Sequence, residues 1–241
     1  MPTARRLAQA LDVMKTLLSI LALLFTTASS SGILEGLAAA DRGDHQAAIS
    51  EYLVAAARGE ATAQALLGAS YAEGRGTEQN LERAAYWYEL AAKQGFRMAQ
   101  YNLALLLASG KGVPQDEVNA RFWTVAAANR GLPQAQNALG TSLYNGIGSP
   151  KNYEAAQRWY GRAANQGHAP AQYNLGLMFA QGRGVKQSST TAYYWWLLAA
   201  SKGDADAKAA LNKMEPRLSA DEILQTQRSA SDWRETLEPE R

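Results

Sequence analysis

The sequence contains no cysteine, and other residues suited to catalysis are scarce. Without cysteine the chain cannot form disulfides, thiolate metal sites, a thiol nucleophile or an N-terminal lipidated cysteine. It has only two histidines, His45 and His168. No Ser/His/Asp group and no His/Glu cluster has the spacing of a catalytic triad or a metal site. We therefore predict that the protein is not an enzyme and uses no cofactor and no metal.

A surplus of charge is also missing from the body of the chain. Lysine and arginine number 24 against 22 aspartates and glutamates, so the formal net charge is +2. Residues 1–30 alone hold Arg5, Arg6 and Lys15 against Asp12, which accounts for that surplus. Phosphate binding requires a basic patch, so we expect no nucleic-acid partner.

The apolar run at the N-terminus, residues 17–25, is shorter than the ~20 residues of a comfortable membrane span. It follows a basic segment and precedes small residues, an order typical of a secretory signal peptide. Ala28-Ser29-Ser30 fits a cleavage site near Ser30. We expect residues 1–30 to be a cleaved signal peptide and the protein to be periplasmic or secreted. The alternative is that residues 17–25 stay attached as an inner-membrane anchor, the one case in which a membrane is a partner.

What the sequence does contain is a pattern of 36 residues written four times over residues 63–206 without insertion or deletion. Two glycines, a tryptophan and a later glycine recur at this step in every copy. The recurring positions are Gly74, Gly110, Gly146 and Gly182; Gly76, Gly112, Gly148 and Gly184; Trp87, Trp123, Trp159 and Trp195; and Gly95, Gly131, Gly167 and Gly203. A fixed period of this length indicates a repeat architecture.

Each copy is expected to form two antiparallel helices. In the first copy a helix runs from Ala63 to Glu73 and ends at Gly74, where a left-handed glycine closes the last turn. A residue suited to N-capping opens the second helix of every copy: Asn80, Asp116, Asn152 and Ser188. That helix ends before the later glycine. We expect the recurring tryptophan to fill the space between helix pairs, while paired alanines allow close approach.

The frame of the repeat divides the chain. The predicted segments are residues 1–30, the signal peptide; 31–62, a degenerate N-terminal repeat; 63–98, 99–134, 135–170 and 171–206, four full repeats; and 207–241, C-terminal capping helices. Ser219 and Glu222 form a capping box, so we expect a closing helix over residues 219–236 that covers the last repeat.

These residues resemble the Sel1-like repeat, a relative of the tetratricopeptide repeat. The resemblance rests on Ala-Gln-Tyr-Asn-Leu-Gly at 171–176, Gly-Arg-Gly-Val at 182–185, Trp195, the alanine pair at 199–200, and Gly203. Ala104 departs from it where the other copies have glycine. The resemblance implies an all-α fold, a right-handed α/α solenoid of antiparallel helix pairs. It also implies a scaffold for protein interactions, often periplasmic, and names no partner.

Positions that vary between otherwise strict copies are candidates for partner binding, because packing does not dictate them. Three such positions lie on the first helix of each repeat. The candidate residues are Tyr101, Asn102, Leu105, Asn137, Thr141, Tyr173, Asn174 and Leu177. Tyrosine is a frequent hot-spot residue. We add Trp196, because we expect either Trp196 or Tyr193 to be an exposed contact. The alternative is that all of these are partly buried packing residues.

The sequence therefore favours an exported protein–protein interaction module that binds a protein or peptide on its solenoid surface, as a regulator, scaffold or inhibitor of an envelope process. Three alternatives remain. The chain could be an immunity protein that neutralises a toxin delivered into the periplasm, a membrane-anchored structural protein, or an enzyme that binds cell-wall or β-lactam ligands, although it lacks the cysteines of relatives linked to penicillin binding. The sequence does not decide the oligomeric state.

Overall fold

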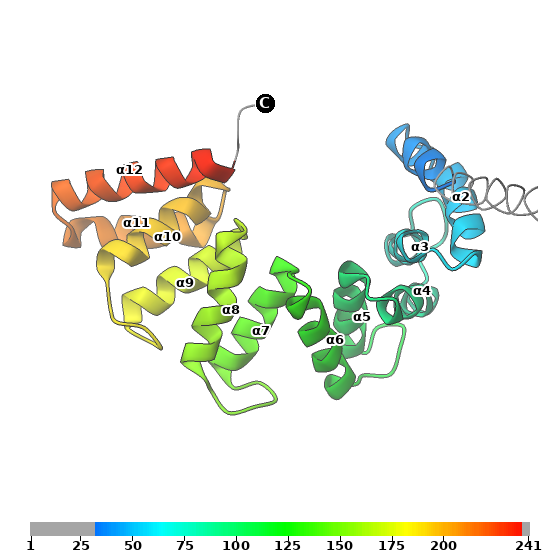
Figure 1. Cartoon of the computed structure of the whole chain (residues 1–241), viewed down its shortest axis with the longest axis horizontal. Helices are drawn as coiled ribbons and strands as arrows, with labels where there is room; N and C mark the ends of the chain where they lie inside the picture. The colour runs from blue at the N-terminus through cyan, green and yellow to red at the C-terminus, as the bar shows by residue number, and fades with distance from the viewer. Residues whose placement is uncertain (1–31, 238–241) are drawn as a thin grey trace, which may run out of the picture. The chain divides into compact units, whose positions relative to one another are not determined.

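The structure is a computed structural model that describes residues 32–237, and every element in this range is a helix (Figure 1). The predicted signal peptide and the alternative anchor at residues 17–25 lie outside the described residues. The chain divides into two compact units, Met1–Asp116 and Glu117–Arg241, which are described separately below.

The first unit contains a helix over residues 32–41 and four helices of 13 residues each: α2 (His45–Ala57), α3 (Ala61–Glu73), α4 (Leu81–Lys93) and α5 (Arg97–Ser109). Each helix from α2 onward packs against the next one in the chain. The degenerate N-terminal segment therefore forms a helix pair of its own, and Asp44 caps α2 by accepting a hydrogen bond from the Ala47 amide at 3.1 Å.

The second unit contains the remaining helices, which also pack in chain order. They are α6 (Glu117–Asn129), α7 (Pro133–Asn145), α8 (Tyr153–Asn165), α9 (Ala169–Gln181), α10 (Ser189–Ser201), α11 (Ala205–Met214), a 3-10 turn (Glu215–Arg217) and α12 (Ala220–Leu237). The closing helix α12 lies against α10, beside α11 (Figure 1). Ser219 and Glu222 make the expected capping box at its start, with the Ser219 amide donating to Glu222 Oε2 at 2.8 Å.

The predicted caps are present. Asn80, Asn152 and Ser188 each accept a hydrogen bond from an amide in the first turn of the helix that follows. The first glycine of each pair closes a helix in the left-handed conformation, as Gly182 does after α9 with φ of 66°. Such a cap satisfies carbonyls that the helix end leaves unpaired, so the chain can turn sharply at the same point in every repeat.

The second glycine of the pair has a different role, which is close approach between consecutive repeats. A Cβ on Gly184 would lie 2.5 Å from the carbonyl carbon of Tyr153, at the start of α8 in the preceding repeat. Gly112 faces Leu81, at the start of α4, in the same way. At these two positions the turn of one repeat therefore rests directly on backbone of the repeat before it, and only glycine fits there, whereas a Cβ on Gly148 would meet only the Arg121 side chain.

The tryptophans that recur at 36-residue steps are only partly buried, although Trp195 packs against the core of the preceding helix pair, α8 and α9, as expected. The deeply buried aromatic is the next residue along the helix: Tyr88, Tyr160 and Trp196 are each at most 4% exposed. Each lies over a glycine of the preceding helix, as Trp196 does over Gly176. The one repeat with Ala104 in place of that glycine also has a threonine in place of the aromatic.

Candidate functional site

Three of the residues predicted to bind a partner come together in one cleft of the second unit. Tyr173 and Leu177 project from α9, and Trp196 comes from α10. The opposite wall belongs to α11 and the turn that follows it. The full lining is Tyr173, Leu177, Ala180, Trp196, Asp206, Ala209, Ala210, Lys213, Met214 and Arg217, around a volume of about 370 Å³.

Trp196 forms the base of this cleft and is held in one orientation. It is 4% exposed, and its Nε1 donates a hydrogen bond to the carbonyl oxygen of Tyr173 at 3.2 Å. The expectation that Trp196 or Tyr193 is an exposed contact is wrong, because both are buried. Residues three apart share a face of a helix, so both rings can turn inward together. Trp196 therefore contributes a rigid apolar floor to the cleft.

The rim of the cleft is polar and slightly cationic. Asp206, Lys213 and Arg217 are exposed on α11 and the following turn, and they carry a net charge of +1. Burial raises the pKa of Tyr173, and the nearby carboxylates of Asp206 and Asp204 raise it further. The Tyr173 hydroxyl is therefore a neutral hydrogen-bond donor at physiological pH. The apolar floor and this rim together match an amphipathic segment of protein.

The other predicted residues of the second unit hydrogen-bond one another. Asn174 Nδ2 donates to Asn137 Oδ1 at 3.0 Å, which links α9 to α7. Thr141 accepts from the Tyr160 hydroxyl at 3.0 Å and donates to the Asn137 carbonyl. Asn137, Thr141 and Asn174 thus form a polar link between neighbouring helices, in line with the alternative that they are packing residues. Whether they also contact a partner stays a prediction.

The remaining candidates lie on α5, in the first unit. Leu105 is 50% exposed, whereas Tyr101 and Asn102 are partly buried. Burial raises the pKa of Tyr101. In Tyr88, burial raises the pKa to about 12, and a hydrogen bond with Asn102 acts in the opposite direction. Asn102 therefore hydrogen-bonds to a buried aromatic residue, Tyr88, and Leu105 is the most exposed of the three candidates.

Seven residues of the cleft were not predicted from the sequence: Ala180, Asp206, Ala209, Ala210, Lys213, Met214 and Arg217. A signal for one of them was present. Lys213 stands 36 residues after Leu177, so it occupies a variable position of the same repeat frame. Residues 205–214 resemble one more first helix of the repeat, but the variable positions were compared only over the four full repeats.

Within residues 32–237 no three of His, Cys, Asp and Glu are grouped as metal ligands. His168 is half-buried before α9, and burial lowers its pKa, with a further contribution from the positive charge of Lys202. In the same part of the chain no helix is both long enough and apolar enough to cross a membrane.

Comparison with family models finds four Sel1 repeats, at residues 61–96, 97–132, 133–168 and 169–204. The chain belongs to the Sel1 repeat family. Sel1 repeats typically mediate interactions between proteins, and their fold is generally a non-catalytic scaffold. Comparison with curated proteins gives no match.

Two solved structures show how this Sel1 repeat chain relates to others. A Sel1 repeat protein from Oxalobacter formigenes is 36% identical, with a TM-score of 0.67 over 70% of this chain and 49% of its own. A protective antigen present in uropathogenic Escherichia coli strains, which displays an SLR fold, is 27% identical, with a TM-score of 0.73 over 87% of this chain and 48% of its own. The chain thus spans about half the length of each.

Proposed function

We propose that this chain is an exported Sel1 repeat protein that binds a segment of a protein partner in the cleft between α9 and α11, and that it acts as a regulator, scaffold or inhibitor of an envelope process. The observation that carries the proposal is the cleft itself. It joins a buried tryptophan floor, the apolar side chains of Leu177 and Met214, and a rim of exposed charges.

The chemistry of the cleft favours a peptide over a small cofactor. Aromatic and aliphatic anchors at the centre with polar groups around them are typical of protein-interaction hot spots. Asp206, Lys213 and Arg217 are exposed, so their contribution is to selectivity and association rate more than to affinity. The fold class supports the same reading, because Sel1 repeats generally serve as scaffolds for protein partners.

Export is the second part of the proposal. It is supported by the basic segment, the apolar run at residues 17–25 and the small residues after it. N-terminal sequencing of the protein recovered from a bacterial envelope fraction would test it. A new terminus near Ser30 is expected. An intact N-terminus in the membrane fraction would favour the anchor instead.

The partner can be sought by affinity capture from envelope extract, with residues 31–241 as bait. A matched pair of variants tests the cleft. Lys213→Glu reverses a charge on its rim, and Lys208→Glu reverses an exposed charge elsewhere on α11. We expect a stoichiometric partner that Lys213→Glu loses and Lys208→Glu retains. Equal retention by both variants would refute binding in this cleft.

A further inference from the structure

The outer face of α6 is apolar, whereas the same face of the equivalent helices α4 and α8 is mainly polar or charged. Val118 is 80% exposed and Phe122 is 59% exposed. These are high exposed fractions for two large apolar side chains one helical turn apart. With Val125, Ala126, Arg121 and Asn129 they line a shallow groove along the helix. Every residue of the groove lies on α6.

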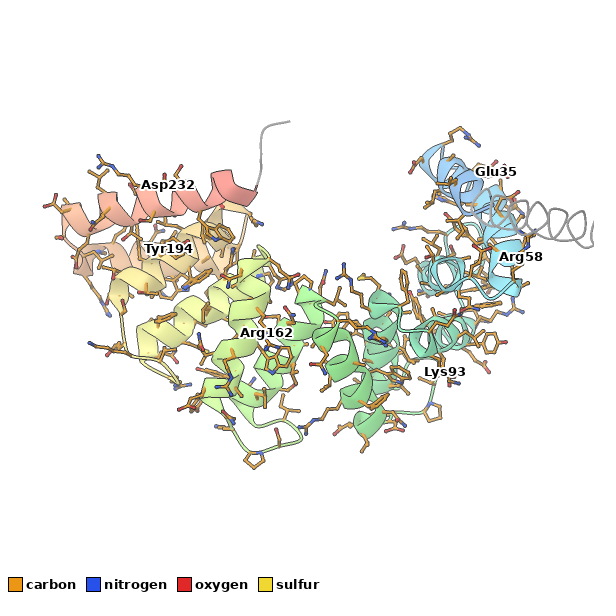
Figure 2. All side chains as sticks on the ribbon, in the orientation of Figure 1. Glu35, Arg58, Lys93, Arg162, Tyr194 and Asp232 are labelled. Carbon is orange, nitrogen blue, oxygen red and sulfur yellow. The ribbon has the colours of Figure 1, made fainter. Side chains whose placement is uncertain are left out.

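In the neighbouring repeats most of the same positions carry charged side chains, and the exceptions are a tyrosine in α4 and a glycine in α8. The positions of Val118, Phe122 and Val125 are Glu82, Tyr86 and Glu89 in α4, and Glu154, Arg158 and Gly161 in α8. In α8 an arginine, Arg162, stands at the position of Ala126. Its guanidinium stacks over the Trp159 ring, 4.5 Å from the ring centroid (Figure 2). The repeat fold therefore does not require an apolar surface here, and α6 carries one for another reason.

The last repeat shows what covers such a surface. In α10 the three positions are Thr190, Tyr194 and Leu197, and all three are partly buried. The helix that covers them is α12, with Tyr194 lying beneath it and Asp232 on its outward side (Figure 2). α12 turns Ile223 and Ala230 inward, at the spacing of an amphipathic helix.

The two faces resemble each other closely. Phe122 meets the ring of Trp123 edge to face, with centroids 4.9 Å apart, and Tyr194 meets Trp195 in the same way at 5.2 Å. Tyr86 and Trp87 of α4 form the same pair, so the likeness of α6 to α10 rests on the flanking positions, where valine and threonine are similar in shape and Glu82 differs. The face of α6 is therefore a more apolar version of the α10 face, and the described helices of the second unit leave it exposed.

We propose that the outer face of α6 binds an amphipathic helix from a partner protein, laid along α6 as α12 is laid along α10. The choice of an amphipathic helix follows from α12, which turns Ile223 and Ala230 toward the core and its charged residues toward water. Arg121, at the edge of the groove, donates a hydrogen bond to the Gly148 carbonyl, so apolar contact with Val118 and Phe122 carries the binding. A second copy of the chain fits less well, since one helix face is far smaller than the ~800 Å² per partner of a standard interface.

The test uses a fluorescein-labelled peptide of residues 219–237 as the probe, because it is the one helix of this chemistry known to fit such a face. Fluorescence anisotropy would follow its binding to residues 31–241. We expect saturable binding that Phe122→Glu weakens at least about tenfold. Tyr86→Glu is the matched control, because it makes the change at the same position of α4 and should leave the affinity unaltered.

Two results would overturn the proposal. One is the absence of saturable binding, or binding that Phe122→Glu leaves unchanged, which would place the peptide on α10 by displacement of α12. The other comes from thermal melting of the variants without peptide. Phe122→Glu should melt within about 4 °C of the parent, and a larger fall would mean that Phe122 already packs within the chain.

Discussion

At the scale of single residues, a buried glutamine in each repeat joins consecutive helix pairs. The four side chains, Gln64, Gln100, Gln136 and Gln172, are at most 4% exposed. Each donates from Nε2 to the carbonyl oxygen eight residues earlier, as Gln136 does to Ala128 at 3.2 Å. These carbonyls belong to the ends of helices, where backbone acceptors lack partners inside the helix.

The hydrogen bond accepted by the Oε1 atom of this glutamine differs between repeats. Gln166 Nε2 donates to Gln136 Oε1 at 2.8 Å. The residue at the same place in the next repeat is Lys202, which donates instead to the Gly167 carbonyl at 2.8 Å. Among the described residues, Gln172 Oε1 has no hydrogen-bond partner. Gln136 therefore makes one more hydrogen bond than Gln172 at the same position of the fold.

This difference predicts an order of stabilities. Gln136→Leu removes two hydrogen bonds and leaves Gln166 Nε2 with only its hydrogen bond to the Arg162 carbonyl, whereas Gln172→Leu removes one hydrogen bond and an unpaired oxygen. We expect Gln136→Leu to lower the free energy of unfolding by about 1–3 kcal/mol, and Gln172→Leu to lower it less. Urea unfolding followed by circular dichroism measures both. An equal or larger loss for Gln172→Leu would contradict the hydrogen-bond account.

A pH dependence follows from two buried tyrosines. Burial raises the pKa of Tyr88 to about 12, and burial together with the neighbouring Glu215 carboxylate raises the pKa of Tyr193 to about 12. A tyrosine in the unfolded chain ionises near pH 10. The stability these residues contribute is therefore complete below about pH 10 and is lost as pH rises toward 12, because ionisation then favours the unfolded state.

We expect the free energy of unfolding to fall steadily from pH 10 upward, and Tyr193→Phe to flatten that fall. Urea titrations between pH 9 and the onset of alkaline unfolding measure it, and the absence of cysteine avoids interference from thiols. Tyr86→Phe is a suitable control, since the Tyr86 ring is 56% exposed. An identical slope in Tyr193→Phe and in the parent would show that Tyr193 is not a source of the effect.

At the scale of the helix, α12 is part of the folded second unit rather than a loose tail. Ala230 is 2% exposed, and Ile223 packs against the core of α10 and α11. Tyr193 of α10 also donates a hydrogen bond to Glu215 Oε1 at 2.7 Å, which ties the turn before α12 to the same core. The closing helix therefore shields apolar surface that the last repeat would otherwise expose to water.

A charge placed under α12 should detach it. Ala230→Glu buries a carboxylate without a partner, and we expect it to lower the free energy of unfolding by about 1–3 kcal/mol. Limited proteolysis should then cleave within residues 220–237 faster than in the parent. Leu224→Glu makes a similar change on the outer side of the same helix, where the side chain is 48% exposed. Comparable cleavage of both variants would argue against docking of α12 through Ala230.

The boundaries of the helices could be predicted from the sequence, whereas the packing of their aromatic residues could not. Asn80, Gly182 and the pair Ser219 and Glu222 act through local hydrogen bonds, and such signals are complete within a few residues. The burial of Trp196 depends instead on Gly176, in another helix. A strict spacing of 36 marks Trp195, whereas the position of Trp196 varies between repeats, so the sequence pattern points to the less buried of the two.

At the scale of the whole molecule, each unit has its own buried residues, and each repeat contacts mainly its neighbours in the chain. In such an architecture stability is close to a sum of repeat and interface contributions. The sequence predicted this architecture because the period is unbroken. It predicted only part of the candidate cleft, because the cleft also uses α11, in which the repeat pattern has nearly faded.

The repeat also offers a comparison between two equivalent surfaces. Tyr173 and Leu177 on α9 have Tyr101 and Leu105 as their counterparts on α5. Among these four, only the pair on α9 lines the cleft floored by Trp196 and bordered by Lys213. If the cleft is the binding site, identical changes to the two pairs should have different effects on a partner.

The measurement that tests this most directly is the affinity of the captured partner for two double variants, by isothermal titration calorimetry. Tyr173→Ala with Leu177→Asp should weaken binding at least about tenfold, because it removes two anchors from the cleft. Tyr101→Ala with Leu105→Asp should leave the affinity within about twofold of the parent. Equal affinity of the two variants, or a larger loss for the α5 pair, would contradict the assignment of the binding site to the cleft between α9 and α11.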